Sequence, residues 1–397
     1  MEKEGFQKNI FLFYLITLFG GLAFIYDLIL VIYYQSFGLS FFQISLVLTI
    51  TSIFTLIFEI PSGAFADLYG KKKSLLIGSF AFFLSFLIIL LSQNFISFLL
   101  AGSILGASFA FNSGAESALI YDSLKKIGRK KEYLGIKARL SVIFFSTTLI
   151  TLFFGPNLYS ISKFIPIFLT AFFGLFSFIF TLFLHEPKQL SKTKSETFIK
   201  RHIIQMKQGF SYILDHYKIV WLVLFSVSFY IFCNLIGTFL EVPYLLDLNF
   251  TLKQISFIYI VGLLIQIFIS KNTEKFEKKL GENNSILMIA LLSGISLFLT
   301  MFFSSYLISI FLGLFWGIAT FRELVVDNYL NKHLKQENRA TILSINSMLL
   351  SLITVLIFPL IGLFTDKYST LFSIALISLS SIVFGLLLYF VKIKNKF

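Results

Sequence analysis

Polar side chains that could bind a proton or a small molecule recur at helical spacing inside long apolar stretches. In the first stretch Gly20, Asp27 and Tyr34 are seven residues apart, which places them on one face of a regular helix. An ionisable side chain inside a bilayer is costly, and it usually faces a bundle interior or a water-filled cavity. Such surroundings disfavour the ionised carboxylate, so an acid there can take up and release a proton as its access to water alternates.

A longer stripe of this kind lies in the seventh apolar stretch. At spacings of four, four, three and three it contains Tyr230, Asn234, Thr238, Glu241 and Tyr244. Asp27 and Glu241 both fall in the predicted outer halves of their stretches. We predict that these two acids carry a coupling proton or bind a cationic ligand. The alternatives are a structural ion pair or simple contact with the outer water.

The fourth and tenth apolar stretches carry similar groups. Their candidate binding residues are Asn112, Glu116, Trp316, Arg322, Glu323 and Asp327. The charged members could instead form structural ion pairs, of which we name Arg322 with Glu323, and Arg139 with Glu59 or Glu116. We favour this structural alternative for the acids near the predicted cytoplasmic ends, which are Glu59, Glu116 and Asp327.

A short polar segment joins the second and third apolar stretches. Its candidate gating residues are Glu59, Pro61, Gly63, Asp67, Gly70, Lys71, Lys72 and Lys73. The Asp67 carboxylate can accept hydrogen bonds from a neighbouring helix N-terminus, where the dipole favours negative charge. The lysines can hold lipid phosphates or carboxylates, and the glycines permit close helix approach. Contacts formed in only one conformation bias the equilibrium between conformations, which predicts a gating role. A solvated turn explains the lysines but not the Gly and Asp spacing.

The elements that must position these residues are membrane-spanning helices. The chain has 397 residues, of which 57% are hydrophobic and 13% charged, and its mean hydropathy is +0.87. A soluble domain carries about 25% charged residues, so this chain needs the bilayer as its solvent. Twelve apolar stretches are long enough to cross as helices: 10–35, 42–66, 74–93, 96–121, 136–157, 161–184, 218–247, 254–271, 285–304, 306–330, 339–364 and 368–391.

Charge placement predicts the orientation of these spans. All but four of the 33 Lys and Arg residues fall in alternate loops or at the termini, and the four exceptions are Lys163, Lys253, Lys367 and Arg322. The positive-inside rule therefore puts both termini in the cytoplasm. It also explains the net charge of +13 as a topology signal, with anionic lipids and not nucleic acid as the counter-charge. We find no removable signal peptide.

The sequence divides into two related halves. At a fixed offset of 211 residues, Gln43-Ile-Ser returns as Gln254-Ile-Ser, and Gly102 and Gly106 return as Gly313 and Gly317. We predict an N-terminal six-helix bundle over 1–184 and a C-terminal one over 218–397. The segment 185–217 between them is predicted to be a cytoplasmic amphipathic linker, because apolar residues recur at helical spacing from Phe198.

Together the polar segment and the duplication resemble the major facilitator superfamily, whose loop pattern is Gly, three residues, Asp, two residues, Gly and then basic residues. Leu68 stands where the family often has Arg. The segments from Phe58 to Gly63, from Ser113 to Leu124 and from Arg339 to Ser344 look like the bacterial drug:proton antiporter branch, which includes macrolide-efflux-like proteins. The antiporters often carry a Gly-rich Gly-Pro motif in span five, of which only Gly155-Pro156 is present.

This resemblance implies an all-α membrane protein with twelve transmembrane helices in two pseudo-symmetric bundles, located in the cytoplasmic membrane. It implies a secondary transporter that works by alternating access, here proton-coupled efflux of amphipathic or drug-like compounds, as in multidrug resistance. The expected partners are a small-molecule substrate, protons or another coupling ion, and membrane lipids; we expect a monomer without a cofactor. Proton symport for nutrient uptake is an alternative, and a membrane-embedded enzyme or a receptor is a further one.

The residues offer little support for an enzyme or a metal site. The lone Cys233 lies in an apolar stretch, and the four histidines, at 185, 202, 216 and 333, form no His-Glu-x-x-His pattern. Neither a Gly-x-Ser-x-Gly elbow nor a phosphate-binding loop is present, since Lys72 follows Lys71 where Ser or Thr is required. We therefore predict no metal, no cofactor and no enzymatic activity.

Overall fold

The computed structural model describes residues 2–186, 204, 207–333 and 339–394. Throughout these residues the regular structure is helical, which confirms the all-α prediction. A bilayer offers no partners to backbone N–H and C=O groups, and a helix satisfies them internally. The predicted amphipathic linker falls mostly outside the described residues, although 207–215 are helical.

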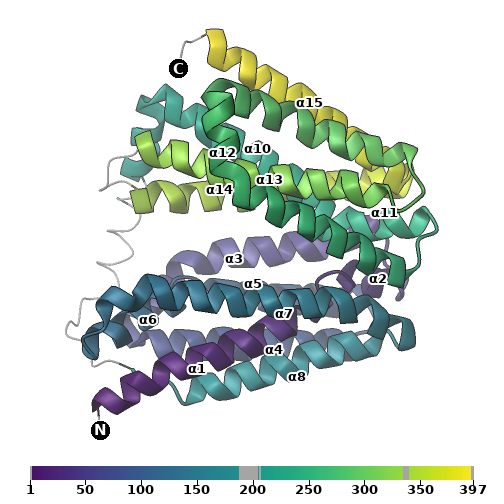
Figure 1. Ribbon diagram of the computed structural model, residues 1–397. Helices are drawn as coiled ribbons and strands as arrows, with labels where there is room; N and C mark the ends of the chain where they lie inside the picture. Colours follow the sequence, from purple (N-terminus) through teal and green to yellow (C-terminus); the bar gives the residue numbers. More distant parts are fainter. Residues whose placement is uncertain (1, 187–203, 205–206, 334–338, 395–397) are drawn as a thin grey trace. The chain divides into compact units, whose positions relative to one another are not determined.

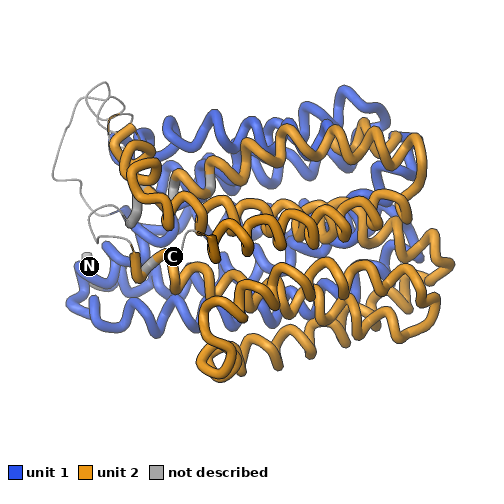
Figure 2. Tube along the Cα trace, turned by 90° about the horizontal axis from the view of Figure 1, so that it is seen from above, with its two compact units in different colours: residues 1–39, 46–203 blue, residues 40–45, 204–397 orange. Residues whose placement is uncertain are grey.

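The chain forms two compact units, which are coloured separately in Figure 2. Unit 1 comprises Met1–Leu39 and Leu46–Ile203, and unit 2 comprises Ser40–Ser45 and Ile204–Phe397. The first turn of the second long helix thus belongs to unit 2 and the rest of that helix to unit 1. The predicted three-part division at 184 and 217 remains a prediction.

The described part of unit 1 holds eight α-helices, of which α3 begins in unit 2, and two short 3-10 turns (Figure 1). In chain order these are α1 (Glu2–Leu22), η1 (Ala23–Tyr26), α2 (Leu30–Gln35), α3 (Phe41–Tyr69), α4 (Lys71–Leu91), α5 (Phe95–Asn112), α6 (Ala115–Lys126), η2 (Lys130–Glu132), α7 (Tyr133–Ile161) and α8 (Phe164–Leu182).

After the helical segment 207–215, the described part of unit 2 continues with six α-helices, of which one is very long, and with a π-helix and a 3-10 turn (Figure 1). They are α10 (Tyr217–Asn234), the π-helix η3 (Leu235–Leu240), α11 (Glu241–Asp247), α12 (Leu252–Leu299), η4 (Thr300–Phe302), α13 (Ile308–His333), α14 (Arg339–Lys367) and α15 (Thr370–Lys394). The short α11 prolongs the line of α10 and η3.

Eleven helical runs in the described part are long and apolar enough to cross a membrane. One run, Leu252–Phe302, covers both the eighth and the ninth predicted spans. Its helix α12 has 48 residues and is interrupted at Gly281, whose φ is 72° and ψ 173°. Two crossings by this run would bring the count to the predicted twelve, which stays a prediction.

The internal repeat corresponds to a helix cap at the start of α3 and at the start of α12. Ser40 and Gln43 cap each other at the N-terminus of α3: Gln43 N donates to Ser40 Oγ at 3.3 Å, and Ser40 N donates to Gln43 Oε1 at 3.1 Å. Thr251 and Gln254 make the same reciprocal capping box at α12. The repeated Gln-Ile-Ser motif therefore begins a helix in each half.

Two of the repeated glycines allow helices to approach closely. A Cβ atom at Gly106 of α5 would lie 2.2 Å from the Thr51 carbonyl oxygen of α3. A Cβ atom at Gly317 of α13 would lie 2.2 Å from Ile269 Cδ1 of α12. Small residues at such positions let helices pack by van der Waals contact in a bilayer, which agrees with a packing role for these glycines.

Candidate functional site

Three of the four helical runs that carry the predicted site residues are interrupted beside those residues. The first run leaves the helix after Tyr26, so Asp27 lies in a turn. The fourth breaks at Ser113 and Gly114, where Gly114 has a φ of 70°. The seventh widens into the π-helix η3 directly before Glu241. Interruptions of this kind are frequent at functional sites because they re-aim side chains and free backbone groups.

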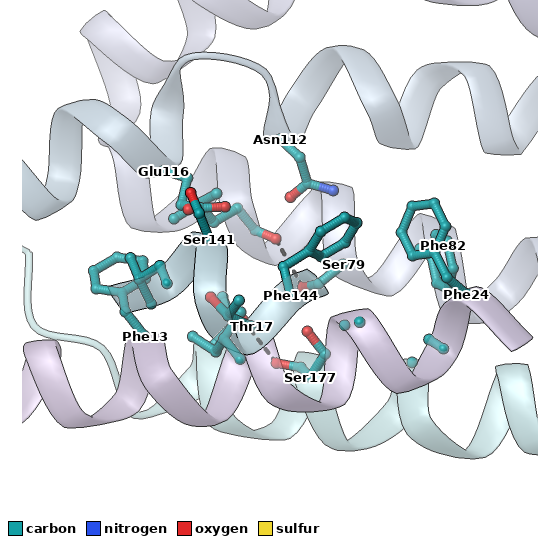
Figure 3. A pocket seen from close by; sticks show the side chains of 18 of the residues that line it. Phe13, Thr17, Phe24, Ser79, Phe82, Asn112, Glu116, Ser141, Phe144 and Ser177 are labelled. Carbon is teal, nitrogen blue, oxygen red and sulfur yellow. Dashed lines mark hydrogen bonds between the residues drawn. The ribbon is translucent and has the colours of Figure 1, made fainter. Parts of the chain in front are cut away.

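Unit 1 contains a cavity of about 390 Å³, between α1, α4, α5, α6, α7 and α8. Figure 3 shows the side chains that line it. Phenyl rings form much of the wall: Phe13, Phe24, Phe82, Phe109, Phe144 and Phe145. Hydroxyl and amide groups are set among them: Thr17, Ser79, Asn112, Ser141, Ser177 and Thr181. The size suits a small molecule, and the lining suits one with both apolar and hydrogen-bonding surface.

The two charges in the cavity wall pair with each other. Glu116, in the first turn of α6, places Oε1 3.6 Å from Lys137 Nζ of α7. Lys137 Nζ also donates to Ser117 Oγ at 3.2 Å. The prediction that Glu116 forms a structural ion pair is thus confirmed. The prediction that Arg139 is its partner is wrong, because the partner is Lys137. A balanced pair leaves the cavity without a net charge.

Adjacent glycines of α1 differ sharply in their surroundings. A Cβ atom at Gly20, which lines the cavity, would meet no heavy atom within 4 Å. One at Gly21 would lie only 2.0 Å from Thr147 Oγ1 of α7. Gly78 of α4 faces Asn112 of the cavity wall, whose Oδ1 would lie 2.6 Å from an added Cβ. Gly21 and Gly78 thus allow close packing, whereas Gly20 opens onto the cavity.

Glu241 is the most deeply buried of the candidate acids, with only 2% of its surface exposed. The indole Nε1 of Trp316 donates to its carboxylate, at 3.1 Å from Oε2 and 3.3 Å from Oε1. Tyr259 of α12 also lies beside this carboxylate. Gly237 makes room for the indole, because a Cβ there would lie 2.5 Å from Trp316 Cη2. Among the described residues, no cation lies within ion-pair distance of Glu241.

The stripe predicted along the seventh span does not persist to Glu241. An i→i+5 turn inserts extra residues into the helical repeat, so side chains after it are rotated relative to those before it. Tyr230 is 37% exposed and Thr238 is exposed, whereas Glu241 and Tyr244 point into the unit. Tyr244 is 1% exposed and pairs with Thr300 Oγ1 at 3.3 Å. The prediction of a single polar face is therefore wrong from η3 onward.

The ion pair predicted between Arg322 and Glu323 is also wrong. Arg322 is 6% exposed, and its Nη1 donates to the carbonyl oxygen of Ser226 at 3.1 Å. Successive residues of α13 point in different directions, so Glu323 is exposed while Arg322 is buried. Asp327 is exposed as well, and Asn234 is partly buried. The structure thus brings Glu241 and Trp316 together but not the remaining candidates of unit 2.

The common face predicted for the first span is likewise absent. Asp27 is exposed in the turn after η1, and Tyr34 is a 1% exposed core residue on the separate helix α2. The Tyr34 ring packs edge-on against Phe98 at 4.8 Å between centroids. Gly20, on α1, is the member of this set that lines the cavity.

The polar segment between α3 and α4 is organised by a residue that the sequence patterns did not single out. The Glu186 carboxylate accepts from the backbone N–H groups of Lys71, at 3.0 Å, and Lys72, at 2.5 Å. It thereby caps the N-terminus of α4. Gly70 is needed here because its φ is 111° and a Cβ would lie 2.8 Å from Glu186 Oε2. Burial raises the pKa of the Glu186 carboxyl, and the N–H groups of Lys72 and Lys71 offset part of that rise.

Asn9 of α1 holds Glu186 in place. Its side chain is fully buried and exchanges two hydrogen bonds with the backbone of His185: Nδ2 donates to the carbonyl oxygen at 2.9 Å, and Oδ1 accepts from the N–H at 2.8 Å. Asn9 Nδ2 also donates to Ser123 Oγ of α6. Sequence spacing gives no signal for these contacts, because their partners lie more than a hundred residues apart.

The other residues of the predicted gating segment are less constrained. Lys71 Nζ forms an ion pair with Asp122 of α6. Pro61 lies inside α3, Glu59 is partly buried, and Lys72 and Lys73 have side chains toward the surface. Asp67 and Gly63 are exposed, and in the described part of the chain Asp67 accepts no hydrogen bond. The gating role predicted for Asp67 stays a prediction.

Unit 2 has a matching charge cluster with the signs reversed. Glu282, which follows the interruption at Gly281, occupies the position equivalent to Lys71 under the offset of 211. Its Oε1 lies 2.8 Å from Lys392 Nζ of α15 and 3.7 Å from Lys218 Nζ of α10. Lys71 is a cation beside the acids Asp122 and Glu186, whereas Glu282 is an acid between two lysines. Each cluster thus joins three segments that are distant in the sequence.

The chain is similar to known proteins over most of its length. A sequence model of the Major Facilitator Superfamily matches residues 10–349. The uncharacterized MFS-type transporter YxaM of Bacillus subtilis is 24% identical over 347 residues, which are 85% of this chain and 84% of YxaM. Among solved structures, a variant of the nucleoside transporter NupG aligns with a TM-score of 0.79 at 12% identity, covering 97% of this chain and 99% of that one. A D-xylose-proton symporter aligns with a TM-score of 0.68 at 13% identity, covering 96% and 97%.

Proposed function

Because the chain belongs to the Major Facilitator Superfamily, we propose that this transporter moves an amphipathic small molecule out of the cell by proton-coupled alternating access. The cytoplasmic membrane, with both termini inside, is the location that the placement of its lysines and arginines supports. The twelve crossings, in two bundles of six, belong to the same proposal.

The observation that carries the proton coupling is the burial of Glu241. Its carboxyl group is 2% exposed, and its hydrogen-bond donor is the neutral Trp316 indole. An ionised carboxylate without a cation is expensive in such surroundings, and protonation removes that cost. Glu241 can therefore hold a proton while buried and release it when the transport cycle exposes the group to water. Trp316 fixes the position of the carboxyl group in both protonation states.

The cavity in unit 1 supports an amphipathic substrate. Its phenyl walls favour flat apolar surface, and its hydroxyl and amide groups provide hydrogen bonds. The Glu116–Lys137 pair balances its own charge at 3.6 Å, so this cavity offers no uncompensated charge to a cationic substrate. Neutral compounds are therefore preferred over the cations that the sequence first indicated. Asp27, exposed in its turn, remains a second candidate for binding a coupling proton.

Uptake by proton symport is the second candidate function. The alignment with a D-xylose-proton symporter and a nucleoside transporter supports it, since such substrates are small, neutral and rich in hydrogen-bonding groups. A membrane-embedded enzyme has less support, because a sequence model of the Major Facilitator Superfamily matches most of the chain.

Flux measurements in proteoliposomes of uniform orientation separate the two functions. We would impose a pH gradient of each sign and follow a radiolabelled macrolide, uridine and D-xylose. Antiport predicts that the macrolide accumulates against the direction of proton flow, and symport predicts that a nutrient accumulates with it. Glu241→Gln should abolish gradient-driven accumulation, whereas Glu274→Gln, at an exposed acid of α12, should not. Equal accumulation with and without a gradient would reject proton coupling.

A further inference from the structure

The cavity in unit 1 carries its charged pair toward one end. Figure 3 shows Glu116 and Ser141 on one side of the cavity and the rings of Phe24 and Phe82 on the other. The Phe24 ring meets Phe144, which also lines the cavity, edge-on at 5.3 Å between centroids. A ligand that fits this arrangement has charged or polar groups at one end and an aromatic ring at the other.

The Glu116–Lys137 pair at the charged end is held loosely. Glu116 Oε1 and Lys137 Nζ are 3.6 Å apart, which is longer than an ordinary hydrogen bond, and the two side chains are 39% and 34% exposed. Ion pairs as open as this one contribute little to stability. A ligand can therefore separate the two charges at small cost, provided that it supplies each of them with a new partner.

The polar groups at this end keep hydrogen-bonding capacity for a ligand. The Lys137 ammonium has three N–H donors and uses one of them on Ser117 Oγ, at 3.2 Å. The Glu116 carboxylate accepts no hydrogen bond from the described residues. The Asn112 amide and the Ser141 hydroxyl line the same cavity, and within the described part of the chain neither makes a side-chain hydrogen bond.

The balance of charge in the cavity selects among possible ligands. A cation would pair with Glu116 and leave Lys137 without its partner, and an anion would do the reverse, which is costly inside a membrane. An uncharged compound offers no ion to either residue. A zwitterion pairs with both residues at once and adds no net charge. It replaces one long ion pair by two charge-assisted hydrogen bonds, which are stronger than neutral ones.

We propose that this cavity binds aromatic zwitterions, which are compounds that carry an ammonium and a carboxylate close together and an aromatic ring, as phenylalanine does. Glu116 binds the ammonium, Lys137 binds the carboxylate, and the ring lies against Phe24, Phe82 and Phe144. The zwitterion site rests on the proposed function, because it takes this cavity as the substrate site of the transporter. It narrows the amphipathic substrate to one chemical class.

Equilibrium binding to the purified protein in detergent tests the zwitterion site without transport. Titration calorimetry compares four ligands that share a phenyl ring: phenylalanine, phenethylamine, which lacks the carboxylate, hydrocinnamate, which lacks the ammonium, and phenethyl alcohol, which is uncharged. Phenylalanine should bind at least about tenfold more tightly than each of the others, because each of them loses at least one charge-assisted contact. An affinity for phenylalanine that does not exceed the other three, or no binding of phenylalanine, would overturn the zwitterion site.

Two variants assign the two contacts. Glu116→Gln should weaken the binding of phenylalanine about tenfold but not that of hydrocinnamate, which has no ammonium for Glu116. Lys137→Gln should weaken the binding of phenylalanine to a similar extent but not that of phenethylamine. A merely structural pair would weaken all four ligands alike, and that result would overturn these contacts. If either variant fails to fold, the ligand series on the wild type still decides.

Glu132→Gln is the matched control. Glu132 is an exposed acid near the start of α7, and it pairs with Arg129 at 2.5 Å. Neither residue lines the cavity, so the affinities of this variant should match those of the wild type. Binding is measured without a gradient, so its failure would leave proton-coupled transport standing. Failure of the flux assay would in turn leave the binding preference standing.

Discussion

Replacing Gly20 by Leu should fill part of the cavity in unit 1 and keep a substrate out of it. A Cβ atom at Gly20 meets no heavy atom within 4 Å, so the new side chain enters open space. Burying a leucine side chain stabilises by about 1.5–3 kcal/mol. Removing a glycine from a helix interior adds about 0.5–1 kcal/mol. The free energy of unfolding should therefore rise by about 2–4 kcal/mol while transport falls.

The neighbouring Gly21→Ala variant is the control, with the opposite sign. Its smaller side chain would place Cβ 2.0 Å from Thr147 Oγ1 and 3.1 Å from Thr147 Cβ. Overpacking of this kind costs about 1–3 kcal/mol, which exceeds the gain in helix propensity. Thr147 must also give up its hydrogen bonds to Ile143 and Phe144 in order to move. The alanine variant should therefore be less stable than the wild type.

Thermal unfolding in detergent and flux in proteoliposomes measure the two effects separately. Gly20→Leu should unfold at a temperature several degrees higher than the wild type, since about 1 kcal/mol shifts Tm by roughly 2–4 °C in a domain of 150–250 residues. At equal amounts of folded protein it should lose at least about tenfold in flux. A melting temperature below that of Gly21→Ala would refute the geometry around Gly20. Wild-type flux in a stabilised Gly20→Leu variant would show that the substrate does not use this cavity.

Three further substitutions test separate parts of the molecule. Asp67→Asn should slow transport roughly fivefold with little loss of folded protein, since it removes the charge that favours a helix N-terminus; wild-type rates in proteoliposomes would count against the gate. Glu241→Gln should retain an acceptor for the Trp316 indole but flatten the pH dependence of flux, and an unchanged pH profile would reject Glu241 as the coupling group. Burial raises the pKa of the Glu186 carboxyl in the folded protein above its value in the unfolded chain. The carboxyl group therefore contributes fully to the free energy of unfolding below the pKa of the unfolded chain. This contribution is lost as pH rises through the pKa of the folded protein. Glu186→Gln should therefore flatten the pH dependence of Tm on the alkaline side of about pH 4, where an ordinary Glu carboxyl titrates, and a steeper curve would contradict this sign.

The parts of the fold that depend on local sequence could be predicted. Apolar stretches identify the spans because a bilayer leaves the backbone little choice but the helix. The repeat also relates Gly106 to Gly317, and in the structure both meet a neighbouring helix. The offset between the halves also predicted that Gln43 and Gln254 are equivalent, and both residues take part in capping boxes. Each of these features needs only residues nearby in the chain or a comparison between similar segments.

The candidate site was harder to predict because its geometry depends on interruptions and on distant partners. Spacing along a regular helix placed Glu241 beside Thr238, but the π-helix η3 turns it toward Trp316, 75 residues away. The same assumption placed Asp27 and Tyr34 on one face, although a turn separates them. A residue such as Glu186 acts on backbone N–H groups, whose positions no side-chain pattern reveals.

The opposite signs at Lys71 and Glu282 have a consequence for the nascent chain. Two halves that share an ancestral pattern offer each other near-equivalent docking surfaces, so a helix could insert beside the wrong partner during synthesis. Lys71 would then meet Lys392 and Lys218, and Glu282 would meet Asp122 and Glu186. Such like-charge encounters are unfavourable, whereas correct docking gives Lys71 and Glu282 partners of opposite charge. The reversal of charge therefore disfavours docking of a helix onto the wrong half of the chain.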